Sequence, residues 1–170
     1  MITAYLAKRY GSNIPTILSP EGGKYLKKHL WRSDFGESDL YVDIIYTPVE
    51  YFDIAGGSRE VEGYNAEKYA VFTVYLNTHQ DRLDPYPLDQ LASLTTEKGA
   101  SYEPLLWKVV YESGDYHHRE SVLIFKKAGE DSRAMTLVLR DLPGRKERLF
   151  EWKLPIPDKP SASNVKKPNR

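Results

Sequence analysis

Apolar and polar residues alternate most regularly between residues 68 and 78. One face of an extended chain would carry Ala70, Phe72, Val74 and Leu76, and the intervening residues would lie on the other face. Successive side chains of a β-strand point to opposite faces of the sheet, so a period of two indicates a strand. The segment therefore predicts a long strand with one face in the core.

Shorter apolar runs follow residue 39, and turn-forming residues separate them. Signals such as Glu97-Lys98-Gly99 and Pro143-Gly144 recur about every eight to twelve residues, which is typical of all-β folds. The other predicted strands span residues 41–46, 49–54, 91–96, 100–103, 105–111, the run to 125, 135–140 and 148–154. No long helical pattern separates them, so we expect an antiparallel sandwich or barrel of about seven to nine strands.

The first forty residues follow a different pattern. Pro20 and Gly22-Gly23 interrupt them, and apolar residues at helical spacing predict short helices at residues 2–10 and 24–31. Helices of fewer than about twelve residues are marginal on their own. Both helices must therefore pack against the rest of the chain or remain loose.

These patterns divide the chain into three parts. Residues 1–37 form an N-terminal arm with short helices, residues 38–155 form a β-sandwich domain, and residues 156–170 form an extended tail rich in proline. A chain of 170 residues suits a single domain of this kind.

The composition excludes several classes of function. Lys plus Arg and Asp plus Glu number 24 each, and a chain without net charge does not attract a phosphate backbone, so general nucleic-acid binding is disfavoured. The chain has no cysteine, which excludes disulfides, thiolate metal ligands and cysteine nucleophiles.

No targeting or membrane-spanning segment is visible. No apolar run approaches the roughly 18 residues that cross a bilayer, and Lys8 and Arg9 interrupt the only N-terminal run that could resemble a secretory signal. Membrane attachment through a removed N-terminal segment is an alternative that the sequence leaves open. The sequence does not determine the oligomeric state either.

Two adjacent histidines, His117 and His118, lie between an acidic glycine turn and the apolar run that ends at Phe125. Adjacent side chains of a strand point to opposite faces, so both can bind one ion only if the backbone kinks, which Gly114 permits. The candidates for a third ligand are His79, at the end of the long strand, and Asp81 or Asp115 in loops. Imidazole suits zinc and copper(II), so one hypothesis is a copper or zinc site.

The other interpretation of the paired histidines is structural, with no cofactor. One imidazole packs inward against a backbone carbonyl, the other faces solvent, and Arg119 pairs with a carboxylate such as Asp141 or Glu147. Trp107 and Trp152 then have structural roles in the apolar runs that contain them.

The sequence contains no recognisable catalytic motif. It has no Gly-x-Ser-x-Gly, no phosphate-binding glycine loop and no His-Glu-x-x-His. We therefore expect that the chain is not an enzyme, and an enzyme of unknown reaction is only the third hypothesis.

Several tyrosines fall on the face of the predicted sheet that points away from the core, among them Tyr41, Tyr69 and Tyr75. Exposed tyrosines on a rigid sheet suit the binding of a protein or a surface glycan, because each ring supplies contact area at low entropic cost. Alternatively, residues 1–35 fold back over this face and cover the rings.

A series of motifs between Val71 and Trp152 resembles a group of uncharacterised bacterial domains. The motifs are the strand sequence at 72–79, Leu-x-x-Leu-Thr-Thr-x-x-Gly at 91–99, Trp107, Gly114-x-x-His117-His118-Arg119, residues 137–142, and Glu147-Arg148-x-Phe150-x-Trp152. These domains have an immunoglobulin-like sandwich and are often exported or membrane-attached. The resemblance covers about half of the chain. It implies an immunoglobulin-like sandwich and an extracytoplasmic or periplasmic location, and it does not cover residues 1–40. Together with the helical pattern of the first forty residues, the prediction is an all-β, immunoglobulin-like antiparallel β-sandwich with a short N-terminal helical arm.

The leading hypothesis is a non-enzymatic binding or assembly module of the bacterial cell envelope, with a protein or surface glycan as partner. The alternative is a metal-binding protein that uses His117, His118 and His79 to bind copper or zinc.

Overall fold

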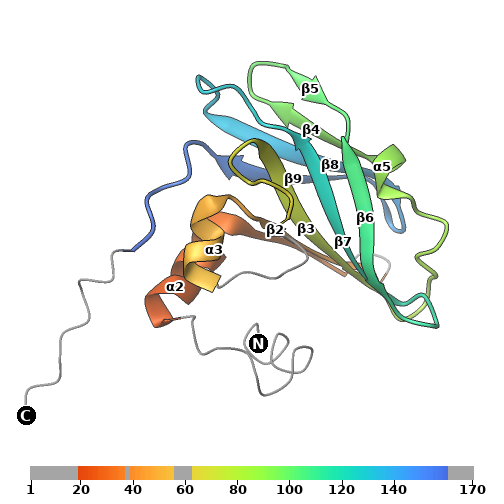
Figure 1. Cartoon of the computed structure of the whole chain (residues 1–170). Coiled ribbons are helices and arrows are strands. Elements are labelled where there is room, and N and C mark those ends of the chain that lie inside the picture. The colour runs from red at the N-terminus through yellow and green to blue at the C-terminus, as the bar shows by residue number, and fades with distance from the viewer. Residues whose placement is uncertain (1–18, 37–38, 56–62, 161–170) are drawn as a thin grey trace, which may run out of the picture.

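Figure 1 shows the computed structural model, which describes residues 19–36, 39–55 and 63–160. These residues form two antiparallel sheets, of five and four strands, with a few short helices. The predicted class, an all-β antiparallel sandwich with a short N-terminal helical arm, is confirmed.

The five-stranded sheet has the order β1-β2-β3-β7-β6. Its strands are β1 (Trp31–Phe35), β2 (Tyr41–Tyr46), β3 (Tyr69–Asn77), β7 (His118–Lys126) and β6 (Leu106–Glu112). The four-stranded sheet has the order β5-β4-β8-β9. Its strands are β5 (Ser101–Tyr102), β4 (Ala92–Thr96), β8 (Ala134–Leu142) and β9 (Arg145–Lys153). The helical segments are α2 (Pro20–Tyr25), η2 (Leu26–Leu30), α3 (Val49–Ala55) and α5 (Leu88–Leu91).

The strand order is that of an immunoglobulin domain. The neighbours β2-β3-β7-β6 occupy the places of strands A, B, E and D, and β4-β8-β9 occupy those of C, F and G. The short β5 adds a C′ strand beside β4, and β1 extends the other sheet beside β2. The connections after β3, β5 and β7 therefore cross between the sheets, while β8 and β9 form a hairpin.

Aromatic residues join the two sheets in the core. The rings of Phe72 and Trp152, from opposite sheets, lie 5.2 Å apart, and Phe125 lies 5.9 Å from Phe72. Trp152 is fully buried, and its indole Nε1 donates a hydrogen bond to the carbonyl of Leu30 over 2.8 Å. This bond ties the N-terminal arm to the core, because Leu30 ends η2.

The first described helix begins earlier than the sequence pattern suggests. The pattern predicts a helix at residues 24–31, whereas α2 begins at Pro20 and η2 ends at Leu30. Ser19 caps α2 by accepting a 3.0 Å hydrogen bond from the backbone N–H of Gly22, and proline suits the first helical turn. These two signals outweigh the glycine pair. The helix predicted at residues 2–10 lies outside the described residues.

The segment predicted as a strand at residues 49–54 is the helix α3, so that prediction is wrong. A run this short fits both the period of a strand and that of a helix, so contact with the sheet determines which of the two forms. As a helix, the segment places Phe52 against the apolar residues Val71, Val122 and Ile124 on the outer face of the five-stranded sheet. The central strands β3 and β7 are consequently buried on both faces.

The sheet also begins before residue 38, because β1 lies within the predicted arm. Its sequence, Trp-Arg-Ser-Asp-Phe, has no regular alternation, and its place in the sheet follows from antiparallel pairing with β2. At the other terminus, Leu154 and Ile156 pack against the core. Within the described residues, no helix is long and apolar enough to cross a membrane.

Candidate functional site

Four connections meet at one end of the sandwich, which we call the loop end. They are residues 36–40, of which 36, 39 and 40 are described, and residues 78–91, 113–117 and 143–144. Strands β1, β3, β6 and β8 end there, and β2, β4, β7 and β9 begin there, as the antiparallel registers require. In antibody variable domains, loops at one end of the sandwich form the binding surface.

The turn before β7 has a defined internal structure. The Ser113 hydroxyl oxygen accepts hydrogen bonds from the backbone N–H groups of His117 (3.1 Å) and His118 (2.9 Å). Hydrogen bonds from the Ser113 hydroxyl and the His117 backbone N–H stabilise the ionised carboxylate and lower the pKa of Asp115. Tyr116, with φ 62°, adopts the left-handed conformation that turns the chain into the strand.

The long connection after β3 packs onto this turn. The Arg82 guanidinium lies 4.3 Å from the centre of the Tyr116 ring, and the backbone N–H of Leu83 donates to the Tyr116 carbonyl over 2.9 Å. Arg82 also pairs with Asp84 at 2.9 Å, and this hydrogen bond lowers the pKa of the Asp84 carboxyl. The two connections therefore form one joined surface.

The three histidines of the metal hypothesis all lie at the loop end, but each has a different neighbour. His117 Nδ1 is 3.5 Å from Asp115 Oδ2, and His118 Nδ1 is 2.8 Å from Asn77 Oδ1. The third, His79, contacts an aromatic ring described below. In the part of the chain that the structure describes, no group of three or more His, Asp or Glu side chains is arranged to hold a metal. Metal binding stays a prediction.

Three aromatic side chains form a row at this end, which we call the aromatic row: Phe35, Tyr41 and His79. The ring centres of Phe35 and Tyr41 lie 6.3 Å apart, and those of Tyr41 and His79 lie 6.5 Å apart. Phe35 is 68% exposed and Tyr41 is 36% exposed. The backbone N–H of His79 donates to Asp39 Oδ2 over 2.8 Å, which fixes the start of its loop.

The sheet register continues the aromatic row sideways. Tyr41 pairs with Asn77, and Asn77 pairs with His118, so the three side chains share the outer face of the sheet. Phe35 is the member that sequence reasoning missed, because it lies in the predicted arm. The glycine at position 36 was the available sequence signal of a turn after an exposed strand end, and its φ of +81° in the structure agrees with that role.

The three predicted contact tyrosines have different surroundings. Tyr41 belongs to the aromatic row, and Tyr69 is half-buried with the Lys68 ammonium 5.2 Å from its ring centre. Tyr75 is only 7% exposed, so its ring offers little surface to a partner in this structure. The alternative that residues 1–35 cover these rings falls partly on residues outside the described ranges.

Arg119 pairs with neither of the carboxylates suggested by the sequence. Its Nε donates to Glu112 Oε2 over 2.5 Å, and its Nη1 donates to the Tyr86 carbonyl over 2.8 Å. The reason is register, because Arg119 lies directly opposite Glu112 in the pairing of β6 with β7. Glu147 instead pairs with Arg140 at 3.4 Å.

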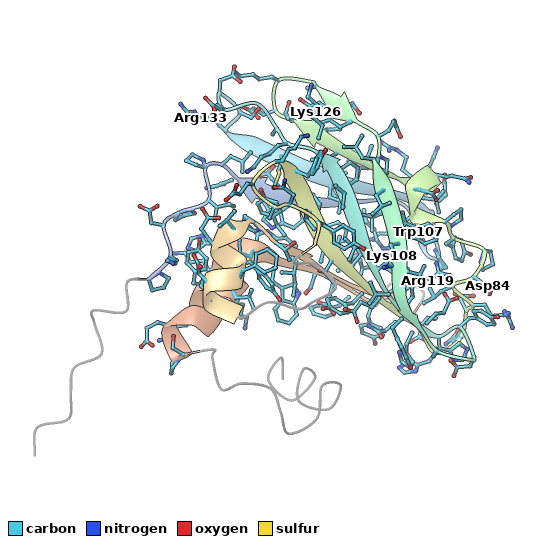
Figure 2. The ribbon with its side chains drawn as sticks, in the orientation of Figure 1. Asp84, Trp107, Lys108, Arg119, Lys126 and Arg133 are labelled. Atoms are coloured by element: carbon cyan, nitrogen blue, oxygen red, sulfur yellow. The ribbon has the colours of Figure 1, made fainter. Side chains whose placement is uncertain are left out.

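Trp107 lies beside this ion pair. Its ring centre is 5.6 Å from the Arg119 guanidinium carbon. Figure 2 labels the two residues close together on β6 and β7, with Asp84 beside Arg119 and with Lys126 and Arg133 toward the end of the sandwich opposite the loop end. Trp107 and Arg119 thus join β6, β7 and the long loop that carries Asp84.

Comparisons with protein-family models, with curated proteins and with solved structures found no significant match to this chain.

Proposed function

We propose that this chain is a non-enzymatic binding module, and that the aromatic row at the loop end contacts a protein partner. The observation that carries the proposal is the exposure of Phe35 next to Tyr41 and His79. Its place in the bacterial cell envelope is part of the proposal and rests on the resemblance of residues 71–152.

The energetic argument starts from Phe35. Removing a phenylalanine side chain from water contributes about 2 kcal/mol, and this ring is 68% exposed. Aromatic anchors of this kind supply most of the binding energy in many protein interfaces. Strand pairing fixes the backbone beneath the row, so little ordering is required on binding.

The tilt of the rings favours a protein over a glycan. Phe35 and Tyr41 are inclined by 60° to each other, and Tyr41 and His79 by 67°. A sugar chain that stacks along a platform needs rings whose faces are roughly parallel. Rings in tilted contact fit apolar side chains that insert between them, as in protein cores.

The charged groups at the loop end support a binding role. Arg82 pairs with Asp84 and Arg119 with Glu112, so each of these charged side chains already has a partner within the loop end. The imidazole of His118 is likewise engaged with Asn77. These contacts give a rigid base for recognition.

The test is affinity capture of proteins from an envelope extract of the source organism with the immobilised full chain. We expect a specific protein to be retained by the wild type and lost with the double variant Phe35→Ala/Tyr41→Ala, with affinity for the purified partner reduced at least about tenfold. Leu149→Ala is the matched control, because Leu149 is 64% exposed on β9 and lies outside the row.

Equal retention by the wild type and the double variant would refute the role of the aromatic row. Retention that survives protease treatment of the extract but not glycosidase treatment would identify a glycan partner and contradict the proposed protein partner.

A further inference from the structure

Two buried polar atoms lie on the inner face of β6 and β7 without a hydrogen-bond partner among the described residues. They are Trp107 Nε1 and Ser121 Oγ, and Ser121 is 0% exposed. Buried polar groups in folded proteins are nearly always paired, with protein or with enclosed water, because an unpaired group loses its hydration without compensation. The two atoms therefore require an explanation.

The sheet register places the two side chains next to each other. Trp107 is opposite Leu123, and Val109 is opposite Ser121, so Trp107 and Ser121 are diagonal neighbours on one face. The Trp107 ring lies 5.6 Å from the guanidinium carbon of Arg119. Because Ser121 lies between Leu123 and Arg119 on β7, a Trp107 ring that starts opposite Leu123 and reaches Arg119 also passes Ser121.

We propose that one enclosed water molecule bridges Trp107 Nε1 and Ser121 Oγ between the two sheets. The indole N–H donates to the water oxygen, and the water donates to the serine hydroxyl. Water satisfies both atoms at once, and buried waters commonly have two to four polar partners.

The charges nearby select water over an anion. Arg119 is the cation beside the two atoms, and its Nε already donates to the Glu112 carboxylate. Asp84 is a second carboxylate close enough for Arg119 to lower its pKa. An anion would add a third negative charge around one positive charge at a buried position, which Coulomb repulsion opposes.

The test combines a crystal structure with the stability of matched variants. We expect electron density for one water within hydrogen-bonding distance of both atoms. Ser121→Ala should raise the unfolding equilibrium constant about tenfold, because it leaves the enclosed water without the hydroxyl that accepts its hydrogen bond. The double variant Trp107→Phe/Ser121→Ala should raise the unfolding equilibrium constant by less than the product of the increases caused by Trp107→Phe and Ser121→Ala alone. In the double variant, neither polar atom remains without a partner.

Thr96→Val is the control, because Thr96 Oγ1, on the other sheet, is another buried atom that has no hydrogen-bond partner among the residues that the structure describes. Removing an isolated buried hydroxyl should leave the unfolding constant unchanged or lower it. The sign of the Ser121→Ala effect therefore decides. A Ser121→Ala variant as stable as the wild type, or density that is absent or belongs to an anion, would overturn the proposal.

Discussion

Two arginine side chains are buried at the loop end, and each lies against a carboxylate and main-chain carbonyls. The side chain of Arg119 is 3% exposed and contacts Glu112, and that of Arg148 is 1% exposed with its Nε 2.8 Å from Asp34 Oδ2. Arg148 also donates to the Pro143 carbonyl, so it fixes the β8–β9 turn to β1. Burying a charge is costly unless it is paired and hydrogen-bonded, which both arginines achieve.

Breaking the Arg119 pair should therefore be costly. We expect Glu112→Gln to lower the free energy of unfolding by about 3 kcal/mol, because it leaves a buried guanidinium without its counter-charge. Urea denaturation measures the change. The control is Glu147→Gln, which removes an exposed pair with Arg140 and should cost about 0.5 kcal/mol or less. Equal effects of the two variants would contradict a buried role for Glu112.

Tyr51 should make stability depend on pH in the alkaline range. Burial, and then the charge of Glu120, raise the pKa of Tyr51 to about 12, from a usual value of 10. Because the pKa of Tyr51 is higher in the folded protein than in the unfolded chain, the neutral phenol contributes stability at pH values below about 10. This contribution is lost as pH rises from about 10 to about 12. Between about pH 9 and about pH 11, the wild type should lose about 1 kcal/mol more than Tyr51→Phe in urea denaturation. Parallel losses would show that Tyr51 ionises freely in the folded protein.

At the residue scale, the sequence identified the paired histidines and the acidic turn beside them, but not the contacts that these residues make. Ser113, Asp115 and Asn77 contact these histidines through the turn geometry and the sheet register, neither of which a linear pattern contains. The Arg119 partner was missed for the same reason. Glu112 precedes the turn, and only the register of the hairpin places it opposite Arg119.

Between elements, the closest described contact at a glycine is where α2 meets α3. A Cβ atom added to Gly22 would lie 2.8 Å from Ile54 Cγ2 and 3.2 Å from Ser19 Oγ. Such a distance to a methyl group of a β-branched side chain requires the two helices to move apart. Glycine therefore serves packing here, although it costs helix propensity.

We expect Gly22→Ala to lower the melting temperature, with a loss of about 1–2 kcal/mol in the free energy of unfolding, even though alanine is the better helix former. Thermal unfolding followed by circular dichroism measures the change. Gly114→Ala is the control, because a Cβ atom there meets nothing within 4 Å, and we expect no loss. A stabilised Gly22→Ala variant would show that the α2–α3 contact yields easily.

Regular alternation predicted the elements that lie in the sheets. The runs at residues 41–46, 68–78 and 135–140 correspond to β2, β3 and β8 within a few residues. Elements that depend on tertiary contact were missed. The helix α3 covers the outer face of a sheet, and β1 is an edge strand without alternation, so neither has a pattern of its own.

For the molecule as a whole, residues 154–160 form a strap across the helices α2 and α3. The Tyr25 hydroxyl donates to the Pro157 carbonyl, and Lys159 Nζ lies 2.6 Å from Asp53 Oδ2. Leu154 and Ile156 pack on the core beneath. The strap thereby joins the last strand to α2 and α3.

Ending the chain after Lys153 should lower the melting temperature by about 5–10 °C relative to a chain that ends after Pro160. The loss follows from exposure of the two apolar side chains and removal of the Tyr25 acceptor, together about 2–3 kcal/mol. Differential scanning calorimetry of both truncated chains measures it. Identical melting temperatures would show that the strap adds nothing to stability.

The hydrogen bond between Tyr25 and Pro157 also places the beginning and the end of the described fold side by side. Both lie beyond the strand ends opposite the loop end, as Figure 1 shows for α2 and the segment after β9. A lipid anchor, a fusion protein or a sensor chip attached through either flank would therefore leave Phe35 and its neighbours facing outward. The two flanks and the proposed contact surface therefore lie at opposite ends of the sandwich.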